Sequence, residues 1–301
     1  MGQSSEVVRR LARRHPYLAK AVLWAFSKVY MLFPKKQHWL LDQIARDIDY
    51  RVPAFAKLGN GMSIQVAWND VVGREIYEYG WYEPDTVRVI ASALKAGDVF
   101  LDIGAHVGQY TLLASEIVGD SGSVHSFEPD PATFQWLSKN VYRNRLMNVT
   151  LNHCAVAGSS GSSIFYLSTT ENIGANSLSP GANFSGKTVE VGCTTVDAYV
   201  AEKRIGRISL MKIDVEGAEL QVLEGAQSLL GRADRPRIVL EFSEAAQKRF
   251  DSCNAKLVSL LCDLGYRLYK ISENGVAEYK FHSGEDSFFN VYAVPAGEIL
   301  R

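Results

Sequence analysis

The chain has 301 residues, 47% of them hydrophobic and 22% charged, which is typical of a soluble globular protein. Its formal net charge of -1 provides no field that would attract nucleic acid, so we expect no nucleic-acid partner. The four cysteines have no paired spacing, which argues against a disulfide framework or a zinc site and favours a reducing, cytoplasmic location.

Residues 1–50 predict a helical extension. Eight Lys or Arg and one acid fall within residues 1–40, where apolar residues recur at nearly helical spacing. A break between two helices is predicted at His15-Pro16, because proline disfavours helical backbone before it. The apolar stretch 17–33 is too short and too charged for a transmembrane helix. We favour packing on the core or on a second subunit, as in a homodimer, over contact of a basic amphipathic helix with a membrane.

Residues 51–301 predict one α/β domain, which begins with irregular segments. Gly59-Asn60-Gly61 beside the run 64–66 predicts a short hairpin whose turn needs positive φ. An aromatic cluster follows, and it either forms a hydrophobic plug or walls a ligand pocket; its members are Tyr77, Tyr79, Trp81 and Tyr82.

From residue 85 the pattern alternates strand and helix, which predicts a Rossmann-like, mostly parallel sheet with helices on both faces. The buried strands are expected at Val99–Ile103, Val124–Phe127, Val149–Leu151, Ile208–Ile213 and Ile238–Phe242. Two later runs, 266–271 and 288–294, are expected to pair as an antiparallel hairpin. The Ser-, Gly- and Asn-rich residues 158–190 predict a long irregular loop.

Part of that loop, residues 168–186, is our candidate lid over the substrate. Its polar side chains Asn172, Asn176 and Ser177 suit a hydroxyl-rich acceptor, and we assign them to substrate binding. The alternative is a solvent-exposed excursion without a role in the site.

The first motif with chemical content runs from Val99 to Gly108, where a buried strand ends at Asp102 and a glycine loop opens the next helix. Gly104 and Gly108 allow a ligand close to the backbone, at the strand end where open α/β sheets bind ligands. The G-x-x-x-G spacing is not the dinucleotide fingerprint, and Asp102 would repel a pyrophosphate. S-adenosylmethionine carries an ammonium and a sulfonium and no phosphate, so the charges favour it over NAD. His106 either contacts this cofactor or shapes the turn.

Acids also end the following strands. Glu128, after the second strand, is placed to accept hydrogen bonds from ribose hydroxyls. Asp214 and Glu216 end the fourth strand and Glu241 ends the fifth, where they could act as a general base or hold a divalent cation. We predict a base, with Asp214 first, and no metal; the alternative for Glu241 is a salt bridge to an arginine. Glu219 is predicted to stabilise a helix start.

Taken together, these runs resemble the FkbM family of methyltransferases. The resemblance starts at Glu83-Pro84 and covers about residues 80–295, through DVFLDIGAHVGQYTLLAS, VHSFEPDPATFQWLSKNV, LMKIDVEGAELQVLEGA and IVLEFSE. The run KIDVEGAE is its most specific part. The resemblance implies a class I methyltransferase domain with a seven-stranded sheet whose last strand is antiparallel. It also implies S-adenosylmethionine as cofactor and methylation of hydroxyls on sugars, glycosides or secondary metabolites such as macrolides.

The resemblance also implies roles by position. Asp214 and Glu216 would lie near the transferred methyl group, and His106 stands where the family usually has Asn. The expected cofactor-binding residues are Glu83, Asp102, Gly104, His106, Gly108, Glu128 and Asp214.

Other functions stay open at this point. An N-methyltransferase of the same fold differs only in pocket geometry, and a non-catalytic binding or scaffold protein could keep the fold. The acids at three strand ends argue against the scaffold. The missing pyrophosphate fingerprint argues against an NAD oxidoreductase.

Overall fold

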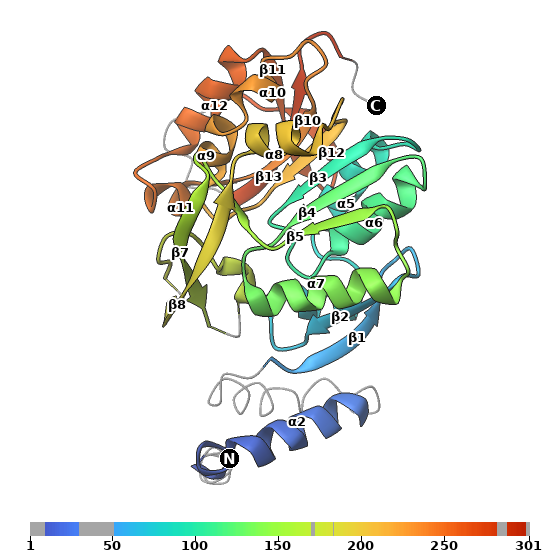
Figure 1. Cartoon of the computed structure of the whole chain (residues 1–301), viewed down its shortest axis with the longest axis vertical. Helices are drawn as coiled ribbons and strands as arrows, with labels where there is room; N and C mark the ends of the chain where they lie inside the picture. The colour runs from blue at the N-terminus through green and yellow to red at the C-terminus, as the bar shows by residue number, and fades with distance from the viewer. Residues whose placement is uncertain (1–9, 30–50, 170–171, 183, 282–287, 299–301) are drawn as a thin grey trace.

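The computed structural model describes residues 10–29, 51–169, 172–182, 184–281 and 288–298. Residues 10–14 are helical, the helix is interrupted at His15, and α2 (Pro16–Val29) follows, which confirms the predicted break. Figure 1 shows α2 apart from the main sheet, next to β1 (Pro53–Lys57). The prediction for residues 30–50 lies outside the described part of the chain. Among the described residues, no helix has the length and apolar character needed to cross a membrane.

A hairpin begins the domain, as predicted. β1 pairs antiparallel with β2 (Ser63–Ala67), and Gly61 in the connecting turn has a φ of +87°, which glycine adopts without steric cost. The next helix, α4 (Val71–Tyr79), starts at Asp70, whose carboxylate accepts a hydrogen bond from the Gly73 N–H.

The main sheet has the strand order β12-β11-β13-β10-β9-β3-β4-β5. The five strands from β10 to β5 are parallel, and β13 runs antiparallel between β10 and β11. The parallel strands are β3 (Val99–Ile103), β4 (Ser123–Phe127), β5 (Val149–Asn152), β9 (Leu210–Ile213) and β10 (Arg237–Ser243). The remaining strands are β11 (Tyr266–Ser272), β12 (Gly275–Glu278) and β13 (Phe288–Pro295).

The sheet confirms the Rossmann-like class and corrects the expected number of strands. The predicted antiparallel last strand is β13, which pairs with β11 as expected. An eighth strand, β12, lies at the edge because Gly275, with a φ of +99°, lets the chain turn back onto β11. All four residues of β12 are exposed, so no hydrophobic alternation in the sequence predicts it.

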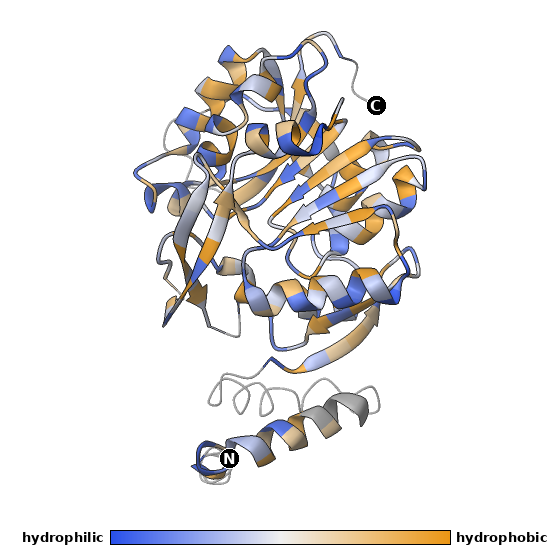
Figure 2. Ribbon diagram, viewed as in Figure 1, coloured by the Kyte–Doolittle hydropathy of each residue, from blue (hydrophilic) through white to orange (hydrophobic). Residues whose placement is uncertain are grey.

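Helices cover both faces of this sheet (Figure 1). On one face lie α5 (Pro84–Ala93), α6 (Gln109–Val118) and α7 (Pro131–Arg143). On the other lie α8 (Val196–Lys203), α9 (Glu219–Glu224), α10 (Gln227–Leu230) and α12 (Asn254–Asp263), while α11 (Glu244–Lys248) follows β10. Figure 2 shows hydrophobic residues along the central strands, as expected for strands buried on both sides.

The prediction of an irregular loop at residues 158–190 is wrong. β7 (Gly161–Ser168) and β8 (Phe184–Thr194) form an antiparallel hairpin, which β6 (Ala155–Val156) extends to a three-stranded sheet. Only Phe165 and Val191 of this hairpin are buried hydrophobics, against Ala155. Its other side chains are exposed or only partly buried, which accounts for its loop-like composition. Between its strands lies the short 3-10 helix η3 (Ile173–Ala175).

The turn after β3 has room for glycine alone. Gly104 has a φ of +84°, and a Cβ there would lie 1.8 Å from the backbone oxygen of Asp214. Gly104→Ala is therefore expected to destabilise the fold by more than the about 1–3 kcal/mol that backbone strain alone costs. Urea unfolding would measure it, with Gly206→Ala as the control, since a Cβ at Gly206 meets nothing within 4 Å. Equal unfolding midpoints for the two variants would contradict this account.

Candidate active site

A cavity of about 640 Å³ opens at the carboxyl ends of β3, β4, β9 and β10, the edge at which parallel α/β sheets bind ligands. Its volume lies within the about 300–1,000 Å³ that is usual for small-molecule sites. The loops after these strands form the floor, and η3 with its neighbours forms the opposite wall. Most of the predicted site residues line it: Gly104, His106, Gly108, Glu128, Asn172, Asn176, Asp214, Glu216 and Glu241.

The glycine loop after β3 uses its backbone donors within the protein. The N–H groups of Gly104 and Ala105 both donate to the Phe127 oxygen, and that of Gly108 donates to Ala105. The His106 N–H donates to Glu128 Oε2 at 2.9 Å. A pyrophosphate bound on this loop would need such donors free, so the loop is not built for one.

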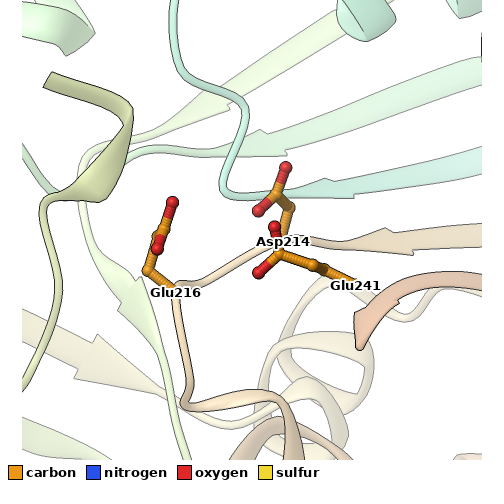
Figure 3. Close-up of side chains that lie close together, drawn as sticks. All are labelled: Asp214, Glu216 and Glu241. Carbon is orange, nitrogen blue, oxygen red and sulfur yellow. The ribbon is translucent and has the colours of Figure 1, made fainter. Parts of the chain in front are cut away.

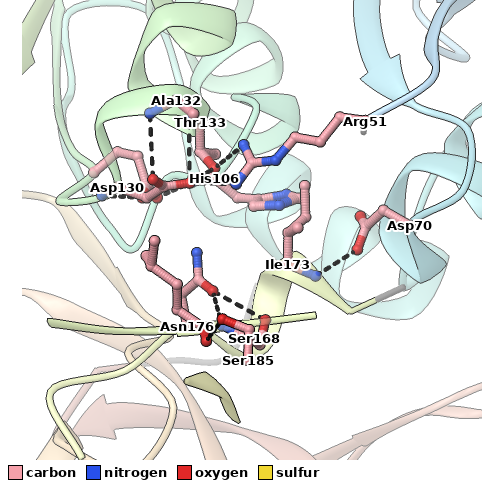
Figure 4. Close-up of polar contacts among 12 residues, drawn as sticks. Arg51, Asp70, His106, Asp130, Ala132, Thr133, Ser168, Ile173, Asn176 and Ser185 are labelled. Atoms are coloured by element: carbon pink, nitrogen blue, oxygen red, sulfur yellow. Dashed lines mark hydrogen bonds and ion pairs between the residues drawn. The ribbon is translucent and has the colours of Figure 1, made fainter. Parts of the chain in front are cut away.

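His106 itself has a φ of +50° and an imidazole whose two nitrogens are buried without a hydrogen-bond partner. Burial lowers the pKa of this imidazole, and the nearby Asp70 acts in the opposite direction. Figure 4 shows the ring between Arg51, which is paired with Asp130, and Asp70. The structure thus places His106 in the cavity wall as a neutral group.

Glu128 is a buried carboxylate in the cavity wall. Its Oε1 accepts the Asp130 N–H at 2.9 Å, and its Oε2 accepts the His106 N–H at 2.9 Å. Burial, with Asp130 beside it, raises the pKa of Glu128 to about 8. Each oxygen accepts one of these bonds and has a second lone pair, so the carboxylate can accept further hydrogen bonds from ligand hydroxyls.

Two of the expected cofactor residues are not among the described residues that line the cavity. Asp102 is fully buried, accepts the Thr111 hydroxyl at 2.5 Å and has its pKa raised to about 6 by burial. Glu83 accepts the Tyr110 hydroxyl at 3.0 Å. The charges of both acids raise the pKa of Lys212, so they stabilise the charged form of the lysine that pairs with Asp214.

Three carboxylates converge on the floor of the cavity (Figure 3). The ligand oxygens of Asp214, Glu216 and Glu241 all lie within 4.8 Å of one another. The Lys212 Nζ is 2.6 Å from Asp214 Oδ2, and an Arg249 Nη2 is 3.6 Å from Glu216 Oε2. Burial, followed by the charge of Asp214, raises the pKa of Glu216 to about 8 and raises that of Glu241 well above its usual value.

Glu219 lies outside this cluster of three and has a structural role. It starts α9, where its Oε1 accepts the N–H groups of Val215 at 3.1 Å and Gly217 at 3.2 Å. The Gln247 amide donates to its other oxygen at 2.5 Å. Glu219 does lie in the first turn of α9, as predicted, but these hydrogen bonds hold the loop before the helix, and no side chain caps the helix start.

The segment around η3 carries the residues assigned to substrate binding. Asn172 and Asn176 line the cavity, whereas Ser177 is buried and donates its hydroxyl to the Glu216 backbone oxygen at 2.9 Å. The Asn176 Oδ1 accepts the backbone N–H and the hydroxyl of Ser168 (Figure 4). Asp70 anchors the segment by accepting the N–H of Ile173 at 2.9 Å.

Sequence reasoning missed Lys212 as a residue of the site and named Tyr82 only as one of two alternatives, a plug or a pocket wall. Tyr82 lines the cavity, and the Gln109 amide holds it by donating to its backbone oxygen and accepting its N–H, both at 3.0 Å. Of the aromatic cluster, Tyr82 is thus a pocket wall, while Trp81 packs into the core. Lys212 is 1% exposed and lies within a buried strand. A lysine in a hydrophobic run was a signal of a nearby acidic group, because a buried lysine needs a charged partner.

The ligand-free protein is expected to lose stability as pH rises from about 5 to about 8. Burial raises the pKa of Glu128 and Glu216 from 4.5 to about 8 and that of Glu219 to about 7. Between these values the folded protein keeps protons that the unfolded chain has released, so stability falls as pH rises. Urea unfolding at several pH values measures the trend. A midpoint that stays constant or rises over this range would rule it out.

The chain matches the sequence model of a family described as the methyltransferase FkbM domain, over residues 102–268. This chain belongs to the FkbM methyltransferase family. It is 28% identical over 200 residues to the 31-O-demethyl-FK506 methyltransferase FkbM of Streptomyces tacrolimicus, across 58% of this chain and 74% of that protein. It is 28% identical over 148 residues to the hexuronic acid methyltransferase AglP of Haloferax volcanii, across 49% of this chain and 58% of that protein.

Solved structures give more distant likenesses. The methyltransferase FkbM from Methylobacillus flagellatus is 14% identical, with a TM-score of 0.42, over 84% of this chain and 65% of that one. A SAM-dependent O-methyltransferase from Thermotoga maritima is 12% identical, also with a TM-score of 0.42, over 85% of this chain and 82% of that one. The FkbM family is thus shown by the sequence match, and the α/β class by the strand order itself.

Proposed function

We propose that this FkbM-family methyltransferase uses S-adenosylmethionine to methylate a hydroxyl of a small molecule, a sugar, a glycoside or a macrolide-like metabolite. The observation that carries the proposal is the cluster of Asp214, Glu216 and Glu241 on the floor of the cavity, next to the glycine loop. An alcohol is a weak nucleophile while protonated, and carboxylates within reach can take its proton.

The cavity fits S-adenosylmethionine in its charges and hydrogen-bonding groups. The buried carboxylate of Glu128 has lone pairs left to accept ribose hydroxyls, and the loop from Gly104 to Gly108 borders the same space. The acids on the floor favour a cationic ligand over a phosphate. The internally bonded N–H groups of the loop also speak against NAD.

S-adenosylmethionine, when bound, supplies a methyl group on a sulfonium that a nucleophile can displace. The residues of the chain hold the acceptor oxygen in line with that group and exclude water. Asp214 is our first choice for the group that takes the hydroxyl proton, with Glu216 and Glu241 beside it. Lys212 keeps Asp214 oriented through their 2.6 Å ion pair.

The polar η3 segment supports a hydroxylated acceptor. Asn172 and Asn176 face the same cavity as the three acids, and the side-chain amide of Asn172 caps no helix. The relatives named above act, by their names, on 31-O-demethyl-FK506 and on a hexuronic acid, and an O-demethyl compound and a hexuronic acid both offer hydroxyls. Transfer of a labelled methyl group to sugar and macrolide alcohols would separate the two classes.

Calorimetric titration with S-adenosylhomocysteine tests the cofactor. We expect micromolar binding of this compound and none of NAD. Glu128→Ala is expected to weaken it about 2–10-fold for each ribose hydrogen bond lost, since a hydrogen bond between uncharged groups contributes about 0.5–1.5 kcal/mol. The control is Glu190→Ala, which removes a carboxylate on the β7–β8 hairpin, away from the cavity lining. An unchanged affinity in Glu128→Ala would exclude the ribose role, and no binding by folded protein would refute the proposal.

A further inference from the structure

We propose that Asp214, Glu216 and Glu241 bind a divalent cation, Mg²⁺ or Mn²⁺. Their ligand oxygens lie within 4.8 Å of one another, and Figure 3 shows the three side chains close together. They follow β9 and end β10, two neighbouring parallel strands whose carboxyl ends meet at one edge. Carboxylate oxygens are the ligands that these hard cations prefer.

Glu241 provides an independent indication of a missing partner. Its side chain lies within the last part of β10, is 4% exposed and lines the cavity. Its Oε2 is fully buried and accepts no hydrogen bond. A buried carboxylate oxygen without a donor is costly, and the cost is removed when a cation occupies the space before it. The arginine salt bridge considered for Glu241 is not among the ion pairs of the described residues.

The protein's own cations do not satisfy the cluster. Lys212 approaches only Asp214 Oδ2, at 2.6 Å, and its amine is held below the floor, 4.8 Å from the centre of the Tyr110 ring. Arg249 approaches Glu216 from the outside, at 3.6 Å, and gives its shorter bond, 2.6 Å, to the Glu216 backbone oxygen. Among the described residues, the three carboxyl groups therefore share two partial ion pairs, and Glu241 takes part in neither.

The spacing fits a small cation after minor side-chain rotation. Mg²⁺ holds oxygens at about 2.0–2.1 Å, so ligands on opposite sides lie about 4.2 Å apart. Three protein oxygens would leave coordination positions for water or for the acceptor. Lowering the pKa of a bound acceptor hydroxyl is the role this ion would have, and that role, unlike the binding itself, rests on the proposed function.

Binding of Mn²⁺ to the EDTA-treated full chain tests the proposal, measured by the loss of the free-Mn²⁺ electron paramagnetic resonance signal. We expect one site, competed by Mg²⁺. Glu241→Gln and Glu216→Gln should each weaken it about 10–100-fold, the loss typical when metal sites are disturbed. Glu216 is the more exposed of the two, so its variant serves if Glu241→Gln does not fold. The matched control is Glu224→Gln, an exposed acid on α9, which should bind as the parent does.

The outcomes separate this proposal from the proposed function. No Mn²⁺ site in protein that binds S-adenosylhomocysteine overturns the cation and leaves the cofactor assignment standing. A Mn²⁺ site that persists unchanged in both cluster variants also overturns it, because the ion then sits elsewhere. A Mn²⁺ site that is lost in both variants supports the cation proposal, whether or not the protein binds S-adenosylhomocysteine. Absence of S-adenosylhomocysteine binding counts against the proposed function alone.

Discussion

Asp214→Asn is expected to lower the rate of methyl transfer by about 10²–10⁴-fold, the range that a positioned general base contributes. Asparagine keeps the shape of the side chain and can still accept a hydrogen bond from Lys212, which lies 2.6 Å from Asp214 Oδ2. It cannot take a proton from the acceptor. Affinity for S-adenosylhomocysteine should remain measurable, so the loss should appear in kcat.

Measurement requires a control that makes the same chemical change outside the site. Glu224→Gln removes an exposed carboxylate from α9 and should leave turnover unchanged. Turnover like that of the parent in Asp214→Asn would exclude Asp214 as the base. Equivalent substitutions at Glu216 and Glu241 would then identify which member of the cluster takes the proton.

Lys212→Met is expected to destabilise the protein by about 3–5 kcal/mol at about pH 8, as when one partner of a buried ion pair is removed. Burial alone would lower the pKa of Lys212, but Asp214 and Glu83 raise it above its usual value, so the amine is charged throughout the neutral range. Methionine fills a similar volume, and the variant leaves several buried acids without their cation.

The loss should shrink toward about pH 5. Burial raises the pKa of Asp102 to about 6, so this acid is largely neutral near pH 5 and no longer needs Lys212; burial shifts the pKa of Glu83 in the same direction. Urea unfolding at both pH values measures the difference, with Lys95→Met as the control at an exposed lysine. A loss that is equal at both pH values would show that lost packing, and not charge, is responsible.

The positions of the parallel strands along the chain and the acids at their ends could be predicted because each depends on neighbours in the chain. Hydrophobic runs followed by Glu128, Asp214 and Glu241 mark buried strands, and the carboxyl ends of parallel strands share one edge. The β7–β8 hairpin was not predicted, since Ser, Gly and Thr are frequent in its strands and only Phe165 and Val191 are buried; the alternation of Val189, Val191 and Cys193 in β8 was the signal available for it. The strand β12 was missed because all four of its residues are exposed.

The sequence by itself determined the class of fold, the family and the edge of the sheet at which the chemistry lies. Tertiary structure alone decided which acids face the cavity. In β3 successive side chains point to opposite faces, so Asp102 shares the face of Phe100 and meets Thr111 on α6 instead of the ligand space. The cluster of Asp214, Glu216 and Glu241 forms because two separate strands lie side by side, and the pKa values of Glu216 and Glu241 depend on burial. The spacing of residues along the chain gives neither the pairing of the strands nor the burial.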